Sequence, residues 1–201
     1  MSRVADGTTA CFILASASPR RRDLLRSAGL SFDIEPGEIE ESRHGDETPR
    51  QYVRRLAAQK ARVVATRHRP ADRRPILAAD TVVLLEGELL EKPEHRQAAR
   101  QMLGRLSGRW HEVMTGFCVI DGAGGEHLEE VVTRVRFKSL CAREIEAYLD
   151  VGEYRDKAGA YGVQGGAGYM VREISGSYTN VVGLPLCQVV EALQQLASGA
   201  A

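Results

Sequence analysis

The sequence predicts an α/β protein, because strand-like and helix-like segments alternate along most of the chain. Short apolar runs bounded by glycine, proline or polar residues are typical of strands. Longer segments with apolar residues three and four positions apart are typical of helices. The alternation of the two kinds of segment favours an α/β class, in which both pack around a common core.

The first strand and helix lie in the stretch ILASASPRRRDLLRSAGL. Its apolar start predicts a strand near 12–16, and helical spacing of apolar residues predicts a helix over 19–28. Ser18 is a favourable N-cap and Pro19 a favourable first helical residue. Gly29 follows the last apolar residue of the pattern and ends the helix.

The alternation continues through the middle of the chain. Helical spacing predicts three further helices, over Pro49–Thr66, Glu94–Leu106 and about 142–150. Apolar and β-branched runs predict extended segments at Phe32–Glu35, Ile76–Leu85, Glu88–Leu90, about 110–120 and about 128–138. A turn at Glu86–Gly87 joins two of these strands into a hairpin.

The C-terminal third is rich in glycine, with seven glycines among the 25 residues from Gly159 to Gly183. Such density indicates either close approach of the backbone to a ligand or a series of turns. A final helix is predicted to begin after Pro185.

The length of the chain indicates how many domains it forms, and its charge indicates which kinds of partner it binds. A chain of 201 residues fits one domain, which we place at residues 11–201 behind a loose N-terminal extension at 1–10. With 27 basic and 27 acidic residues the formal net charge is zero. This balance argues against a general nucleic-acid binder, although it allows a local basic cleft.

The cysteines and the hydropathy define the expected environment. The cysteines are scattered and form no CxxC pair, so we expect neither a zinc site nor a disulfide framework. A reducing cytoplasm is the simplest setting. No apolar run approaches the length of a membrane span, so no membrane partner is expected. The cysteines are Cys11, Cys118, Cys141 and Cys187.

Three consecutive arginines, Arg20, Arg21 and Arg22, stand at the start of the first predicted helix. A helix N-terminus is already positive, so cations there are unfavourable unless an external anion is bound. A helix N-terminus reinforced by guanidinium groups suits a phosphate. The alternative is an arginine-rich surface, because the chain contains 23 Arg and only 4 Lys.

Carboxylates supply candidates for base and metal chemistry. Asp80 interrupts the apolar run ILAADTVVLL, where an unpaired buried carboxylate would be costly. At the mouth of an α/β sheet it could bind a metal or act as a general base; a capping aspartate is the alternative. Glu38, Glu40 and Glu41 form an acidic cluster, and Glu41 with Asp80 would give magnesium its usual carboxylate pair. A solvated acidic loop is the alternative there.

Lysine and glutamine add candidates for phosphate and base recognition. The chain uses arginine for most of its basic residues, so the lysines at 60 and 92 indicate positions where a compact ammonium group is needed. We expect Lys60 and Lys92 to bind phosphate oxygens; ordinary surface positions are the alternative. Gln164 lies among glycines and offers a donor and an acceptor that complement O4 and N3 of uracil or thymine. An ordinary loop glutamine is the alternative. His111 is interpreted as structural.

Several common sites are absent from the sequence. It contains no GxxxxGK[ST] phosphate loop and no GxSxG nucleophile elbow. The GxG spacings lie outside a strand–helix start, so a dinucleotide-binding fold is not indicated.

Six segments together resemble the Maf family of nucleoside triphosphate pyrophosphatases. In order along the chain they are SASPRR, AADTVV, EKP, MLGRLSGRWHEVMTG, KAGAYGVQG and GSYTNVVGLP. The similarity runs from about Ile13 to the C-terminal helix. It implies a two-lobed α/β fold around an extended twisted mixed sheet with a central cleft, in a homodimer.

The resemblance also implies an activity. Members hydrolyse a nucleoside triphosphate to the monophosphate and pyrophosphate with Mg²⁺ or Mn²⁺, and this sequence is similar to the branch that accepts dTTP and UTP. Asp80 matches the catalytic aspartate, and Glu41 and Asp80 are the implied metal ligands. Base specificity is implied for Arg20, Thr81 and Gln164. Phosphate binding is implied for Ser16, Arg20, Arg21, Lys60 and Lys92.

Other functions compete with this one. A non-catalytic nucleotide-binding regulator of cell division would bind dTTP without releasing pyrophosphate. An enzyme that removes ITP or XTP would prefer purines. A nucleic-acid-binding module is disfavoured by the zero net charge and by the lack of an aromatic stacking platform.

Overall fold

The computed structural model describes residues 12–68 and 72–198. The predicted N-terminal extension over 1–10 and Cys11 lie outside these residues. Within them, seven strands form one mixed sheet in the order β2-β1-β3-β5-β6-β7, with β4 paired to β3. The strands are β1 Phe12–Leu14, β2 Phe32–Ile34, β3 Ile76–Leu85, β4 Glu88–Leu90, β5 Trp110–Ile120, β6 Glu126–Phe137 and β7 Val171–Ser175.

The helices and the strand directions confirm the predicted α/β class. β1 pairs in parallel with β2 and β3, whereas the β3–β4 and β6–β7 pairs are antiparallel. The helices of the described residues are α1 Pro19–Ser27, α2 Pro49–Ala65, α3 Arg96–Leu106, α4 Ala142–Val151, α5 Tyr178–Val182 and α6 Leu186–Ser198. Two 3₁₀ turns, η1 Ala158–Ala160 and η2 Gly166–Met170, lie in the glycine-rich segment.

The chain divides into two compact units. The first unit comprises the chain up to Asp80, Gly116–Glu129 and the part from Leu186 onward; the second comprises Thr81–Thr115 and Glu130–Pro185. Strands β3, β5 and β6 therefore contribute residues to both units. The assignment of residues 11–201 to a single domain stays a prediction.

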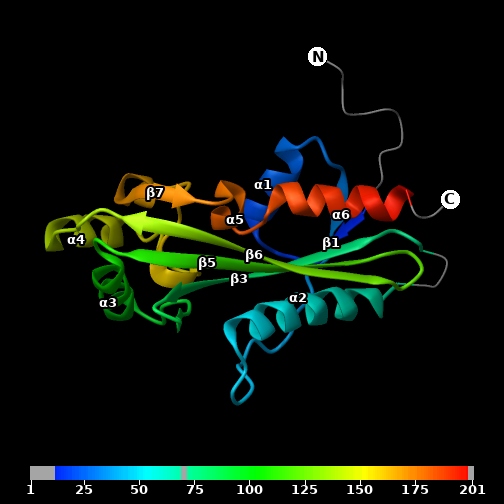
Figure 1. Cartoon of the computed structure of the whole chain (residues 1–201), viewed down its shortest axis with the longest axis horizontal. Coiled ribbons are helices and arrows are strands. Elements are labelled where there is room, and N and C mark those ends of the chain that lie inside the picture. Colours follow the sequence, from blue (N-terminus) through cyan, green and yellow to red (C-terminus); the bar gives the residue numbers. More distant parts are fainter. Residues whose placement is uncertain (1–11, 69–71, 199–201) are drawn as a thin grey trace. The chain divides into compact units, whose positions relative to one another are not determined.

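The core of the first unit is built between α2 and the sheet. Small residues on one face of α2, among them Ala57, Ala61 and Val64, pack against Ile13 of β1 and Ile76 of β3. Because alanine adds little bulk, this helix lies close to the strands. In Figure 1, α2 covers one side of these strands, and α1 and α6 lie on the other. The helix begins at a capping box, in which Thr48 and Gln51 satisfy each other's backbone N–H groups.

The second unit has its own core. Leu103 and Leu106 of α3, Leu149 of α4 and Phe137 of β6 are buried in it. The α3 helix begins at Arg96, two residues later than predicted, because the His95 side chain accepts a hydrogen bond from the Ala98 N–H and so acts as the N-cap.

His111 is buried in this core, as its structural interpretation predicts. It is 2% exposed, its Nε2 lies 2.8 Å from the Tyr161 hydroxyl, and its ring packs edge-on against Phe137. Burial lowers the pKa of His111 to about 4.

The depressed pKa of His111 predicts a loss of stability in acid. Between about pH 6.5 and pH 4 the unfolded histidine binds a proton that the native one does not, so the free energy of unfolding falls as the pH is lowered, by up to about 3 kcal/mol. His111→Gln keeps a polar partner for Tyr161 but does not titrate. Urea denaturation from pH 7 to pH 4.5 should therefore show a shallower acid loss in this variant. Identical pH profiles would contradict the prediction.

The described cysteines differ in their environments. Cys118, Cys141 and Cys187 are free thiols. Cys118 is buried in the first unit, and burial raises its pKa to about 12. Cys141 of the second unit and Cys187 of the first are exposed.

Candidate functional site

The centre of the candidate site is a lysine between two carboxylates in the first unit. Lys60 Nζ lies 2.6 Å from Asp80 Oδ1 and 2.6 Å from Glu41 Oε1. The Lys60 and Asp80 side chains are only 11% and 13% exposed, whereas that of Glu41 is 39% exposed. The ion pair with Lys60 thus offsets the free-energy cost of burying the Asp80 carboxylate in an apolar strand.

Three different elements supply these groups. Lys60 is on the strand-facing side of α2, Asp80 lies in the middle of β3, and Glu41 lies in the segment between β2 and α2. Ala57, one turn before Lys60 on that helix face, is small and leaves room for the lysine side chain to reach β3. The structure therefore brings together three residues that the sequence predicts to act together.

A second group lies at the turn between β1 and α1. Ser16 is buried, and its Oγ accepts hydrogen bonds from Arg21 Nη1 at 3.0 Å and from the Ser18 N–H at 3.3 Å. The first turn of α1, all of it within the described residues, carries no acidic side chain. Binding of an external anion at this N-terminus stays a prediction.

Arg21 connects this turn to the carboxylates electrostatically. Burial lowers the pKa of its guanidinium, the negative charges of Asp80 and Glu41 oppose this shift, and the positive charge of Arg20 reinforces it. An arginine remains charged in any protein environment. The arginines at the start of α1 and the carboxylates around Lys60 therefore influence each other electrostatically within the first unit.

The remaining predicted residues belong to the second unit. Thr81 is partly buried, and its Oγ1 lies 2.9 Å from Thr115 Oγ1 and donates to the Gly183 carbonyl at 3.3 Å. Lys92 and Gln164 are exposed, and Gln164 lies in the turn between η1 and η2. The roles predicted for these residues stay predictions.

The carboxylate pair suits a hard divalent cation. Magnesium binds through one or two carboxylates and completes its coordination with water and substrate phosphates. Glu41 and Asp80 supply oxygen donors of this kind, and the Lys60 ammonium between them shows that the position attracts positive charge. The described residues contain no group of three or more His, Cys, Asp or Glu side chains able to hold a metal by themselves. The donors present therefore fit a cation that a nucleotide helps to bind.

Two features of the structure were not predicted from the sequence. The Tyr52 hydroxyl, on the buried face of α2, donates to the Glu41 carbonyl at 2.7 Å. Asn180 of α5 is fully buried, and its Nδ2 lies near Val113 O, Val131 O and Thr133 Oγ1. The helical period of the sequence identifies Tyr52 only as a residue on the apolar face of its helix. Helix α5 is too short for such a period to be recognised in the sequence.

None of the described helices has the length and apolarity needed to cross a membrane.

The chain is similar to known proteins over nearly its whole length. The family described as "Maf-like protein" matches residues 11–196. A protein of Geotalea uraniireducens (strain Rf4), named dTTP/UTP pyrophosphatase, is 51% identical over 185 residues, which cover 92% of this chain and 94% of the relative.

Two further relatives carry the same name. The protein of Citrifermentans bemidjiense is 50% identical, with 90% of this chain and 93% of the relative covered. That of Geobacter sulfurreducens is 49% identical, with 92% and 95% covered. The predicted family is thereby confirmed, and the chain belongs to the Maf family.

Proposed function

We propose that this protein hydrolyses dTTP and UTP between the α- and β-phosphates, releasing the nucleoside monophosphate and pyrophosphate. The observation that carries the proposal is the contact of the buried Lys60 ammonium with both Asp80 and Glu41, in the electrostatic environment of Arg21. Relatives about half identical in sequence are named for this activity. A non-catalytic regulator would not need a base and a cation-binding carboxylate held together in this way.

Asp80 is proposed to act as the general base. Its Oδ1 accepts a hydrogen bond from Lys60, which fixes the carboxylate, and Oδ2 is proposed to take the proton of the attacking water. The water oxygen attacks the α-phosphorus as its proton passes to Asp80, and pyrophosphate departs. The positive charge of the Lys60 ammonium offsets the negative charge of the carboxylate in its partly buried position.

Arg20, Arg21 and Ser16 are proposed to bind the triphosphate. Charge spreads onto the phosphate oxygens as the bond to the leaving group breaks, and fixed cations stabilise this charge. The hydrogen bond from Arg21 to Ser16 holds the guanidinium at the N-terminus of α1, where backbone N–H groups point outward.

A divalent cation, Mg²⁺ or Mn²⁺, is proposed to be held by Glu41 and Asp80. When bound, such a cation polarises the phosphoryl oxygens and neutralises their charge. Lys60 then shares the two carboxylates with the cation and is available to the phosphate oxygens.

Roles in recognition of the pyrimidine base are proposed separately for Arg20 of the first unit and for Thr81 and Gln164 of the second. Lys92 is proposed to bind phosphate. A homodimer and a cytoplasmic location stay predictions.

A nucleotide screen tests the proposed function. The purified protein is incubated with Mg²⁺ and each common nucleoside triphosphate, and pyrophosphate and orthophosphate are measured separately. We expect pyrophosphate from dTTP and UTP and little from purine nucleotides. Preferred hydrolysis of ITP or XTP, or binding of dTTP without pyrophosphate release, would replace the proposal with one of its rivals.

A further inference from the structure

The segment between β2 and α2 must be held in place by side chains. Residues 35–48, all within the described part of the chain, contain neither helix nor strand, and Glu41 lies near their middle. Such segments lack the repeated backbone hydrogen bonds that order helices and sheets. The position of Glu41 therefore depends on specific anchoring contacts.

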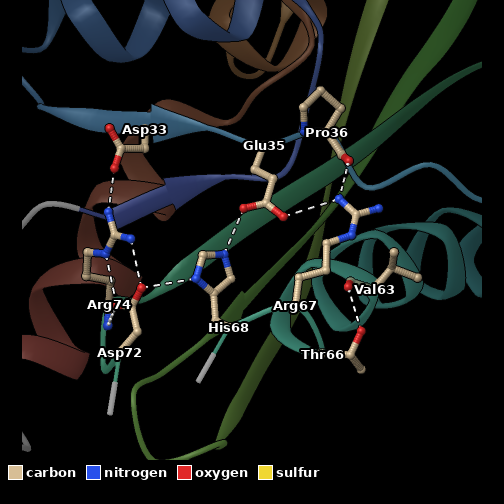
Figure 2. A network of polar contacts seen from close by, with 9 residues as sticks. All are labelled: Asp33, Glu35, Pro36, Val63, Thr66, Arg67, His68, Asp72 and Arg74. Atoms are coloured by element: carbon tan, nitrogen blue, oxygen red, sulfur yellow. Dashed lines mark hydrogen bonds and ion pairs between the residues drawn. The ribbon is translucent and has the colours of Figure 1, made fainter. Parts of the chain in front are cut away.

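The beginning of this segment is anchored to the C-terminal end of α2 and the residues after it. In Figure 2, the Glu35 carboxylate lies against both His68 and Arg67, and Arg67 reaches the Pro36 carbonyl. The distance from His68 Nε2 to Glu35 Oε2 is 2.8 Å. At Gly37 the main chains touch, because a Cβ built there would lie 2.3 Å from the Lys60 carbonyl oxygen.

The end of the segment is anchored to the first half of α2. Arg55 Nη2 donates to the Ser42 carbonyl at 2.9 Å, and Arg55 Nε donates to Glu47 Oε1 at 2.7 Å. The hydrogen bond to Glu47 raises the pKa of Arg55. These contacts flank Glu41 but do not hold it.

Tyr52 supplies the contact at Glu41. The residue is 5% exposed on the buried face of α2, and its hydroxyl donates to the Glu41 carbonyl at 2.7 Å. Lys60, two turns further along the same helix, holds the Glu41 carboxylate. One helix thus fixes both the main chain and the side chain of the same residue.

The ion pair alone is insufficient to order Glu41. The Glu41 side chain is 39% exposed, and ion pairs at such exposure contribute little because solvent screens them. A cation that binds Glu41 would then have to order its backbone as well, which lowers the affinity. We propose that Tyr52 is a positioning residue for the cation site, which it prepares by fixing the main chain of Glu41. This inference rests on the proposed function, in which Glu41 is a cation ligand.

The variant Tyr52→Phe tests the role, because it keeps the buried ring and removes only the hydroxyl. The probe is Mn²⁺, titrated into the whole protein with the α,β-imido analogue of dTTP and followed by electron paramagnetic resonance. We expect the dissociation constant of Mn²⁺ to rise about 3- to 10-fold, the equivalent of one lost hydrogen bond. In activity assays the Mg²⁺ concentration for half-maximal rate should rise similarly, with kcat at saturating Mg²⁺ close to wild type.

Two further variants make the result decisive. Tyr169→Phe is the matched control, since the Tyr169 hydroxyl also donates to a glutamate carbonyl, that of Glu144, at 3.4 Å, but in the second unit. It should leave Mn²⁺ binding unchanged. Glu41→Gln should weaken Mn²⁺ binding more than Tyr52→Phe does.

The possible outcomes separate the inference from the proposed function. Wild-type Mn²⁺ affinity in Tyr52→Phe, alongside weakened binding in Glu41→Gln, would overturn the role of Tyr52 alone. Wild-type affinity in Glu41→Gln would overturn the proposed cation site. Metal-free binding of the analogue should be unchanged in Tyr52→Phe. If it falls as much as Mn²⁺ binding does, the hydroxyl supports the fold generally and the positioning role is overturned.

Discussion

Asp80→Asn is expected to bind dTTP almost as well as the wild type but to release pyrophosphate about 10³-fold more slowly. Asparagine has the same shape and can still accept a hydrogen bond from Lys60 through its carbonyl oxygen. It cannot take a proton from water, so the loss should fall on kcat and not on binding. Steady-state pyrophosphate release measures the rate, and calorimetry with the α,β-imido analogue measures the affinity.

Asp46→Asn is the matched control for this experiment. Asp46 is exposed in the same unit, and it has no part in the proposed chemistry. We expect its kinetics to be those of the wild type. Near wild-type turnover in Asp80→Asn would remove Asp80 from the mechanism, whereas an equal loss in both variants would point to a general effect of charge.

Lys60→Met is expected to lower both the activity and the stability. Methionine preserves most of the buried stem but leaves Asp80 and Glu41 facing each other without their shared cation. Removing one member of a buried ionic group costs about 3 kcal/mol, and the exposure of Glu41 reduces this value. Loss of a cation beside the phosphates should lower kcat by about 10²-fold.

Added Mg²⁺ should show whether a divalent cation binds at Asp80 and Glu41, the two carboxylates that Lys60 contacts. If the cation binds at the same carboxylates, it should raise the melting temperature of Lys60→Met more than that of the wild type, because it replaces the missing charge. Lys138→Met is the control, since Lys138 pairs with Glu144 in the second unit. Equal stabilisation of all three proteins by Mg²⁺ would contradict a cation site at Glu41 and Asp80.

Strands and long helices were predicted well where local chemistry determines them. The β3–β4 hairpin has the predicted bounds, because Glu86 and Gly87 adopt the positive φ values, 54° and 84°, that a tight turn between strands requires. The glycine-rich part was predicted poorly. Helix α5 spans five residues, which is too short for a period of 3.6 to be recognised. Strand β7 also spans five residues, and its sequence VREIS does not alternate apolar and polar residues.

The candidate site was predictable as a set of charges but not as an arrangement. Burial of Asp80 within an apolar strand demands a partner, and this identifies the need for a cation without identifying Lys60. The contact between Tyr52 and Glu41 joins residues eleven positions apart through a backbone carbonyl. Every residue has such a carbonyl, so no side-chain pattern in the sequence signals this bond.

The contrast between the buried and exposed thiols gives the molecule a natural pair of labelling positions. A thiol with a pKa near 12, such as Cys118, stays protonated at neutral pH and resists maleimide reagents. Cys141 and Cys187 are accessible, and each unit carries one of them. With Cys11 replaced by serine, spin labels or fluorophores on these two positions would report the distance between the units, with and without nucleotide.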